Sequence, residues 1–318
     1  MSNIPFVTLA DPRYGEAVRL TPRITRLVAE NPSKFTYHGT GTYLVGEGRQ
    51  VAVIDPGPRL DSHRDALAAA LRGREVIAIC ITHCHADHSP LAAWLSAETG
   101  APTIGFGPHP RLDDPDADEP ITVDAPSAGE AVEAVEETTD YDFEPHHRVV
   151  DGELAVVGPG FTLRAVHTPG HTSNHLCFAL EEDDALFTGD HVMGWSTTVI
   201  APPDGDMAAY FDSLRRVMTR DDRVLWPTHG APVTDPGPYL EAFLAHRLER
   251  EAQVLAAVRS GRTEVAEMVK LLYADVREEL HKAAGRSVLA HLLKLVADGA
   301  VATDDGGRPS LKARYRPV

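Results

Sequence analysis

The sequence predicts a mixed α+β fold that is followed by a small, mostly helical C-terminal region. Through about the first 240 residues, short apolar runs rich in Ile and Val alternate with Gly- and Pro-containing turns and short helical segments. From Tyr239 onward the apolar residues recur at helical spacing instead. We therefore expect two domains, one over residues 1–240 and a C-terminal domain over residues 241–318.

The composition is that of a globular protein. Of the 318 residues, 43% are apolar and 24% are charged, and no apolar run reaches the roughly 18–20 residues that cross a bilayer. The first residues lack the basic stretch and the apolar stretch of a secretory signal. Three cysteines are too few for a disulfide framework and suit a reducing compartment. These features predict a cytoplasmic protein with no membrane partner.

Acidic residues concentrate in the first domain. From Ala245 onward there are 13 basic and 10 acidic residues, so the first 244 residues hold 17 basic and 37 acidic residues, a balance of −20. The segment 109–144 alone carries 13 acidic residues and one basic residue. We expect an acidic surface insertion there, with one short helix, either solvated or acting as a lid over the active site. A body of this charge repels polyanions at long range.

The clearest local unit is a strand, a turn and a helix. The run REVIAICIT has the Ile and Val content of a buried strand, and Pro90 opens a helical stretch with Ser89 placed as its N-cap. The turn between them, THCHADH, therefore lies at the carboxyl end of a strand, where α/β folds place their chemistry. Residues 145–240 repeat this plan, because ALFTGD and RVLWPTHG each end a strand-like run with a Gly-containing turn that carries Asp or His.

The C-terminal region has the element order of a winged helix. A helix from Tyr239 stops at Gly261, and two further helices precede a two-strand ribbon that turns near Gly306. The stretch that would be the recognition helix, Ala283–Ala297, is mostly Ala, Val and Leu. That composition favours packing against the first domain or against a second copy of the chain, as in a homodimer.

Four side chains of metal-ligand type fall within six residues. They form the pattern H-x-H-x-D-H, with His83, His85, Asp87 and His88. Imidazole nitrogens and carboxylate oxygens bind Zn²⁺ at about 2.0–2.2 Å, and a tight turn can direct several of them inward. Packing alone does not account for four such residues directly after a buried strand. The pattern therefore predicts a metal site.

Three later turns supply further ligands to that site. They are TPGH with His171, FTGD with Asp190 and PTHG with His229. Each alone indicates little, because His and Asp beside Gly are common in turns. In this order and spacing, they indicate one metal centre.

Together these motifs resemble those of the metallo-β-lactamase superfamily over about the first 240 residues. The resemblance implies an αββα sandwich and a hydrolase that uses two zinc ions and a metal-bridging hydroxide, which Asp87 would hold and orient. It also implies two ligand sets and a bridging carboxylate: His83, His85 and His171; Asp87, His88 and His229; and Asp190 between them.

The resemblance narrows to one branch of that superfamily. The stretch from TPGHTSNH to GWSTTV and the tail with HRLERE resemble the branch of the lactamase-beta-like protein 2 endoribonucleases, which carries a C-terminal winged-helix domain. Similar chains also include thioesterases that release polyketides from carrier proteins. This branch membership leaves the substrate open.

Neighbouring residues carry separate expectations. Cys84 is expected to point into packing, because its neighbours already fill the ligand roles. His175 is the candidate for a second catalytic group that donates to the substrate oxyanion, with a supporting place behind the ligands as the alternative. His191 is expected to be structural. Trp195 to Thr198 either line the pocket or form a strand edge, and one helix face is expected to tie the tail to the body: His246, Arg247, Arg250 and Glu251.

Three hypotheses for function follow. The leading one is a dinuclear zinc hydrolase acting on a small ester or thioester. An endoribonuclease on single-stranded RNA is the alternative, although a nuclease needs a basic track, which only Lys312, Arg314 and Arg316 in the tail could supply. The third is a winged-helix binding module with a metal-sensing domain, but an exposed recognition helix should carry more Arg, Lys, Asn and Gln.

Overall fold

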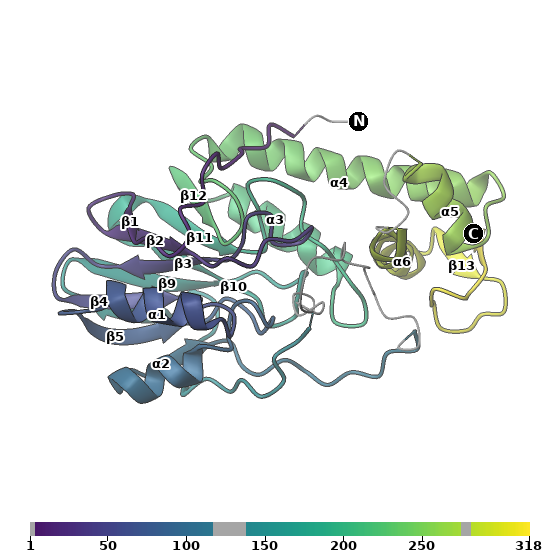
Figure 1. Cartoon of the computed structure of the whole chain (residues 1–318). Coiled ribbons are helices and arrows are strands. Elements are labelled where there is room, and N and C mark those ends of the chain that lie inside the picture. The colour runs from purple at the N-terminus through teal and green to yellow at the C-terminus, as the bar shows by residue number, and fades with distance from the viewer. Residues whose placement is uncertain (1–3, 117–137, 275–280) are drawn as a thin grey trace.

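Two β-sheets packed face to face form the centre of the protein (Figure 1). The structure is a computed structural model that describes residues 4–116, 138–274 and 281–318. The first sheet has seven strands in chain order: β1 (Val18–Arg19), β2 (Ile24–Val28), β3 (Gly41–Val45), β4 (Gln50–Ile54), β5 (Glu75–Cys80), β6 (Thr103–Gly105) and β7 (His147–Arg148). The second has five strands in the order β12 (Val224–Pro227), β11 (Ala185–Gly189), β10 (Leu176–Leu180), β9 (Phe161–His167) and β8 (Leu154–Gly158). Between β10 and β11 lies one 3-10 turn, Glu181–Asp183.

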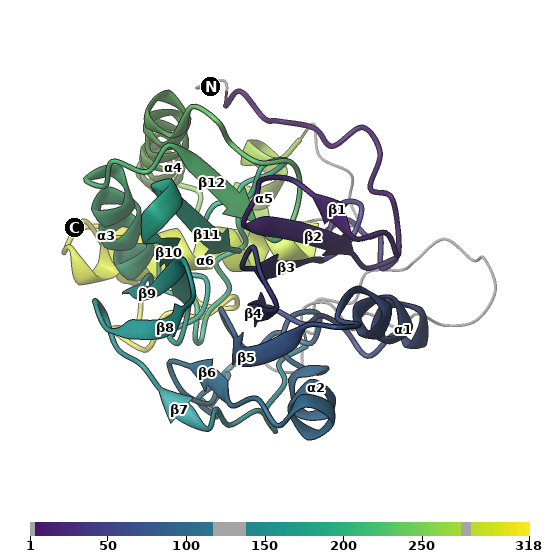
Figure 2. The ribbon, with the colours of Figure 1, turned by 90° about the vertical axis from the view of Figure 1, so that its left-hand side faces the viewer.

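Helices cover the outer faces of both sheets (Figure 2). Helices α1 (Asp61–Ala70) and α2 (Ala92–Thr99) pack on the first sheet through Leu67 and Leu95. Helices α3 (Met207–Met218) and α4 (Pro236–Arg259) pack on the second sheet through Phe211 and Phe243. Apolar residues of β2 to β5 meet those of β9 to β12 between the sheets. The predicted αββα sandwich is confirmed.

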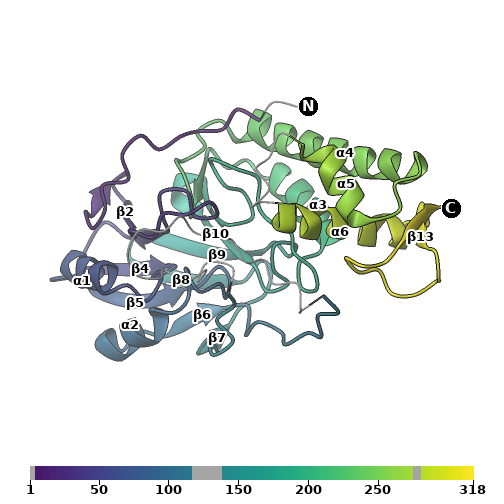
Figure 3. The same cartoon turned by 45° about the vertical axis from the view of Figure 1, so that its right-hand side comes forward.

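The C-terminal region adds α5 (Val265–Leu272), α6 (His281–Ala297) and an antiparallel ribbon of β13 (Val301–Thr303) and β14 (Tyr315–Pro317), which lie beside the far end of α4 (Figure 3). Met268, Leu292 and Tyr315 pack with the end of α4 in one apolar cluster. This confirms the winged-helix order of elements.

Helix α4 crosses the predicted domain boundary at residue 240. It begins at Pro236, three residues before the predicted start, because proline is accommodated in the first turn of a helix. Its first half packs on α3 and its second half belongs to the C-terminal cluster. The division into 1–240 and 241–318 stays a prediction.

Ser89 does not cap α2, which corrects the prediction. The N-cap residue is Leu91, and the Ser89 hydroxyl donates to Asp140 Oδ2 at 2.7 Å instead.

Of the acidic insertion, residues 109–116 and 138–144 are described, and the predicted short helix falls on residues outside the described ranges. Within those ranges, no helix combines the length and apolar character needed to cross a bilayer.

Candidate metal centre and substrate pocket

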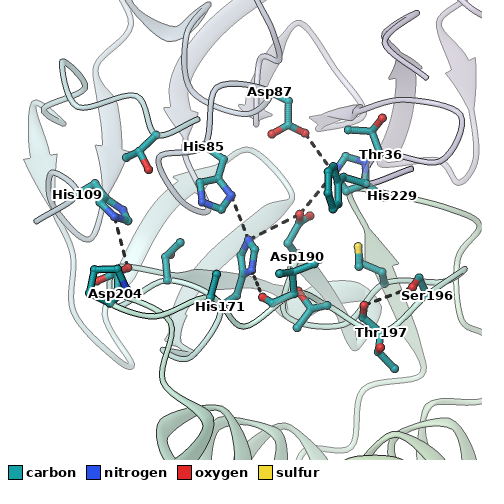
Figure 4. A pocket seen from close by; sticks show the side chains of 18 of the residues that line it. Thr36, His85, Asp87, His109, His171, Asp190, Ser196, Thr197, Asp204 and His229 are labelled. Carbon is teal, nitrogen blue, oxygen red and sulfur yellow. Dashed lines mark hydrogen bonds and ion pairs between the residues drawn. The ribbon is translucent and has the colours of Figure 1, made fainter. Parts of the chain in front are cut away.

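The predicted ligands meet at one end of the sandwich, at the carboxyl ends of strands β5, β9, β11 and β12. Nε2 of His83 lies 3.0 Å from Nδ1 of His85. Nε2 of His171 lies 3.1 Å from that same atom of His85 (Figure 4). These three nitrogens form one group that could hold a metal ion.

A second group lies beside the first. Oδ2 of Asp87 is 3.2 Å from Nε2 of His88 and 3.2 Å from Nε2 of His229. Asp190 lies between the groups, because its Oδ1 is 3.6 Å from His88 Nε2 and its Oδ2 is 3.4 Å from His229 Nε2 and 3.9 Å from His171 Nε2. All seven predicted ligands are therefore brought together.

The outer ring nitrogens of four histidines face oxygen acceptors. Nδ1 of His171 donates to Val199 O at 2.6 Å, and Nδ1 of His229 donates to Gly39 O at 3.1 Å. Nδ1 of His83 donates to Thr82 Oγ1 at 3.1 Å, since that hydroxyl itself donates to Asp55. The fourth is His88, whose Nδ1 faces Asp55. Such outer partners fix the tautomer of the neutral ring and leave its Nε2 as an inward lone pair.

Asp55 is a functional residue that the sequence interpretation missed. Its Oδ2 accepts from His88 Nδ1 at 2.9 Å, and its Oδ1 accepts from the Thr82 amide at 2.8 Å. Asp55 has a φ of 48°, a left-handed conformation that Asp and Asn tolerate better than most residues. The signal was present in VAVIDPGP, where Asp follows an apolar run as it does in the FTGD turn.

Burial and charge divide the histidines into two classes. Burial holds the pKa of His83 and of His85 well below the usual value, and neighbouring imidazoles act in the same direction. Burial also opposes the charged form of His88 and His229, but the nearby carboxylates outweigh it, so the pKa of His88 lies well above its usual value and that of His229 rises to about 10. Burial likewise disfavours ionised Asp190, yet His229 and His88 hold the pKa of its carboxyl well below the usual range.

The donor chemistry fits a divalent metal ion. Two ligand atoms that share a tetrahedral zinc ion lie about 3.4 Å apart, close to the separations within each group. When the rings are neutral, the three nitrogens of the first group have one proton at most between them, on His85. Moreover, Nε2 of His88 and Oδ1 of Asp190 are buried without a hydrogen-bond partner among the described residues. A cation would satisfy all of these lone pairs.

His175 lies behind the ligands, outside the pocket lining. Its Nε2 accepts from the backbone amide of Asp190 at 3.2 Å, so its Nδ1 carries the proton that Thr168 Oγ1 accepts at 2.8 Å. Gly189 passes so close that a Cβ there would meet Nε2 of His175 at 2.7 Å. This geometry favours the alternative in which His175 supports a candidate ligand from behind over the one in which it donates to a substrate oxyanion.

A pocket of about 240 Å³ opens over the metal-ligand groups. His85, Asp87, His171, Asp190 and His229 contribute to its lining, and its apolar wall comes from other parts of the chain: Phe35, Leu112, Tyr141, Met193 and Trp195. Trp195 stacks on Tyr37 with ring centroids 5.0 Å apart, which fixes the indole. The expectation that Trp195 to Thr198 line the pocket agrees with this geometry.

The other expectations can also be placed. Cys84 is buried and its sulfur accepts from Asn174 Nδ2 at 3.0 Å, away from the ligand groups. His191 is fully buried and packs on Tyr210. On α4, Arg247 donates to Thr198 O of the first domain and so ties the tail to the body, whereas Arg250 donates to Leu272 O at 3.0 Å within the C-terminal region.

Comparison with known protein families identifies the family of this chain. The family described as the metallo-beta-lactamase superfamily matches residues 38–229, which is more than half of the chain and includes all seven predicted ligands. The chain belongs to the metallo-beta-lactamase superfamily. A second family, the beta-lactamase associated winged helix domain, matches residues 265–308.

Curated relatives of this superfamily member cover most of its length. An atrochrysone carboxyl ACP thioesterase of Aspergillus chevalieri is 32% identical and covers 92% of this chain and 86% of the relative. A lactamase-like protein of Aspergillus niger is 29% identical, with 94% and 87% covered. Within the superfamily, the protein is accordingly a hydrolase.

Solved structures share the whole fold. A beta-lactamase domain protein from Burkholderia ambifaria superposes with a TM-score of 0.76 at 21% identity, covering 98% of this chain and 97% of that one. A metallo-beta-lactamase family protein from Thermus thermophilus superposes with a TM-score of 0.71 at 24% identity, covering 94% and 100%. At these sequence identities, the similarity shows a shared fold, and the high coverage means that it extends to the C-terminal elements.

Proposed function

We propose that this protein is a dinuclear zinc hydrolase that cleaves small esters or thioesters, with an acyl thioester on a carrier protein as the preferred class. The observation that carries the proposal is the position of Asp190 between two complete ligand groups at the base of the pocket. The thioesterases among its relatives favour a thioester over an oxygen ester.

The ligand roles in this proposal follow the two groups. His83, His85 and His171 would hold one ion, Asp87, His88 and His229 would hold the other, and Asp190 would bridge them. When bound, two such ions would supply an activated water and a Lewis acid for the carbonyl oxygen.

The chain's own residues orient the reactants. Asp87 faces the pocket and receives a hydrogen bond at Oδ2 from Thr40 Oγ1 at 2.8 Å, which fixes the carboxylate that would hold the attacking water. The apolar wall with Leu112 and Trp195 would bind the acyl group and exclude bulk water around it. His175 holds the Asp190 backbone and thereby the bridging carboxylate.

The charge of the lining favours a neutral carbonyl substrate over RNA. Among the described residues, the lining contains four aspartates and one lysine, Lys34. The tail cations Lys312, Arg314 and Arg316 lie outside this lining, and Arg314 pairs with Glu264. A chain of phosphates would therefore meet carboxylates along the pocket instead of a basic track.

The winged-helix binding hypothesis loses its recognition surface. Most of the described part of α6 is buried, and two of its cations are engaged within the chain, Arg286 by Asp114 and Lys294 by Glu251 and Asp298. The predicted packing of this helix against the first domain is thus observed. A homodimer through the C-terminal region stays a prediction.

One comparison of activities tests the proposal. Zinc-loaded protein is assayed against acetyl and aromatic acyl thioesters, p-nitrophenyl acetate, bis-p-nitrophenyl phosphate and single-stranded RNA, at low and at physiological salt. We expect thioester hydrolysis that is lost in His83→Ala and kept in His147→Ala, a variant of an exposed histidine on β7. RNA cleavage that persists at physiological salt and disappears in His83→Ala, without thioester hydrolysis, would establish the nuclease alternative.

A further inference from the structure

One buried arginine of the C-terminal region contacts the first domain beside the pocket. Arg286 lies on α6, and only 5% of its surface is exposed. Its guanidinium makes four hydrogen bonds, all of them to two segments of the first domain. A buried guanidinium with this many acceptors has one orientation, because each lost contact would leave a buried charge less well solvated.

The first of these segments is 109–116. Arg286 binds the Asp114 carboxylate in a bidentate manner, with Nη1 to Oδ1 at 3.1 Å and Nη2 to Oδ2 at 2.9 Å. Nη2 also donates to Asp116 O at 3.0 Å. Asp116 is anchored a second time, since both its carboxylate oxygens accept from the Leu311 amide at 3.1 and 3.0 Å.

The second segment follows the pocket residues Trp195 to Val199. Nη1 of Arg286 donates to Pro202 O at 3.1 Å. The neighbouring Asp204 receives the Ser173 amide at 2.8 Å, which connects this segment to the turn that carries His171. Arg286 therefore joins two stretches that are far apart in the sequence.

Both segments form the same wall of the pocket. From the first come His109, Pro110, Leu112 and Asp114, and from the second come Ala201, Pro203 and Asp204. On the pocket side the segments meet through His109 Nε2 and Asp204 Oδ2, which are 3.6 Å apart (Figure 4). Behind that contact, Asp114 and Pro203 line both the pocket and the cavity under α6, so the Arg286–Asp114 pair forms part of the partition between them.

We propose that Arg286 is a positioning residue for substrate: it clamps segments 109–116 and 201–204 together and so sets the position of the Leu112 wall over the metal-ligand groups. The C-terminal region thereby completes the acyl pocket, although none of its described residues lines it. Because displacement of a reactant by about 1 Å can cost up to about 100-fold in rate, loss of the clamp should weaken binding of large acyl groups most. Only the kinetic part of this inference rests on the proposed thioesterase function.

The chain offers a matched control. Arg250 on α4 is also buried, donates to Leu272 O and lies over the Tyr273 ring at 4.4 Å. Both of these contacts lie within the C-terminal region, and Arg250 is not among the residues that line the pocket. Arg250→Met should loosen that region without moving the pocket wall, whereas Arg286→Met should move the wall.

The first test is hydrogen exchange on full-length, metal-loaded protein. We expect the peptides over 109–116 and 198–206 to exchange about tenfold faster in Arg286→Met and in the milder Asp114→Asn, but not in Arg250→Met. The amide of Asp116, which donates to Asp114 Oδ1 at 2.9 Å, is a direct reporter. Unchanged exchange over these peptides in both clamp variants would overturn the proposal, whatever reaction the enzyme catalyses.

The second test separates positioning from the cost of an unpaired charge. In Arg286→Met/Asp114→Asn neither charge is left alone, so the free energy of unfolding should recover toward the wild-type value. The clamp stays absent, because Pro202 O and Asp116 O still lack their donor. We expect exchange over 109–116 to stay fast in this double variant, and wild-type exchange there would show that Arg286 acts only as a counter-charge.

Kinetics give the functional measure. For an aromatic acyl thioester we expect KM about tenfold higher in Arg286→Met, with kcat/KM for p-nitrophenyl acetate within about twofold of wild type. Equal losses for both substrates, or the same loss in Arg250→Met, would contradict a positioning role. If wild type hydrolyses none of these substrates, the proposed function fails, and the exchange experiment still decides the clamp.

Discussion

Asp55 and His88 form a buried pair in which carboxylate Oδ2 lies 2.9 Å from imidazole Nδ1, and neither side chain is more than 1% exposed. The pair connects the end of β4 to the turn after β5, and it aims Nε2 of His88 at the carboxylates of Asp87 and Asp190. Asp55 thus orients the candidate metal ligand His88 without belonging to either ligand group itself.

Replacing Asp55 should weaken metal binding. Asparagine tolerates the left-handed backbone at this position, so Asp55→Asn removes mainly the carboxylate behind His88. We expect metal affinity about 10–100-fold lower, measured by competition with a chromophoric chelator. Asp61→Asn, an exposed change at the start of α1, is the control and should bind like wild type. Equal affinities in all three proteins would contradict the role of Asp55.

Metal content should depend on the shared carboxylate. Elemental analysis of protein purified without chelator should find about two divalent ions per chain. Asp190→Ala should lower that content, because Asp190 contacts ligands of both groups, and Asp212→Ala should not, because Asp212 is an exposed residue of α3 outside the ligand groups. Full content together with full activity in Asp190→Ala would exclude its bridging assignment.

The three cysteines should resist thiol reagents. Burial raises the pKa of Cys84 and of Cys177 to about 12 and raises that of Cys80 further. Because the thiolate is the reactive form, Ellman's reagent at about pH 8 should label none of them in the native protein and all three in concentrated guanidinium chloride. Rapid labelling of any one thiol in the native protein would mean that this cysteine is accessible to solvent, contrary to the prediction.

Acid should weaken the fold through His63. This side chain is 2% exposed beside Thr42, and burial lowers its pKa to about 4. Between about pH 6.5 and 4 the unfolded chain binds a proton at His63 that the native protein does not, so the contribution is present above pH 6.5 and is lost as pH falls. Between these limits, protonation of His63 should lower the free energy of unfolding by an amount of the order of 3 kcal/mol.

Metal-free protein isolates this effect. Denaturant unfolding in chelator at about pH 7 and pH 5 should show a smaller acid-induced loss in His63→Gln than in wild type, since only wild type protonates His63. Titration of the metal-ligand histidines is common to both proteins and cancels in the difference. Identical losses in the two proteins would mean that His63 does not titrate in this range.

The sequence by itself determined the sandwich, through the family that its motifs resemble, together with the order of the C-terminal elements and the set of candidate ligands. Apolar runs such as REVIAICIT specify a buried strand locally, and the pattern H-x-H-x-D-H places four ligand types on the turn that follows it. Both signals lie within a short stretch of chain, so no knowledge of distant contacts is needed to interpret them.

Only the tertiary structure decided what lies behind and beside those ligands. Asp55 reaches His88 because β4 and β5 are neighbouring parallel strands, and His175 reaches the Asp190 amide because the turns after β9 and β11 meet. Ser89 found Asp140 as its partner in place of the helix terminus. Arg286 and Asp114 are 172 residues apart in the chain. Hydrogen bonds of this kind depend on which segments pack together, and a residue's neighbours in sequence carry no record of that.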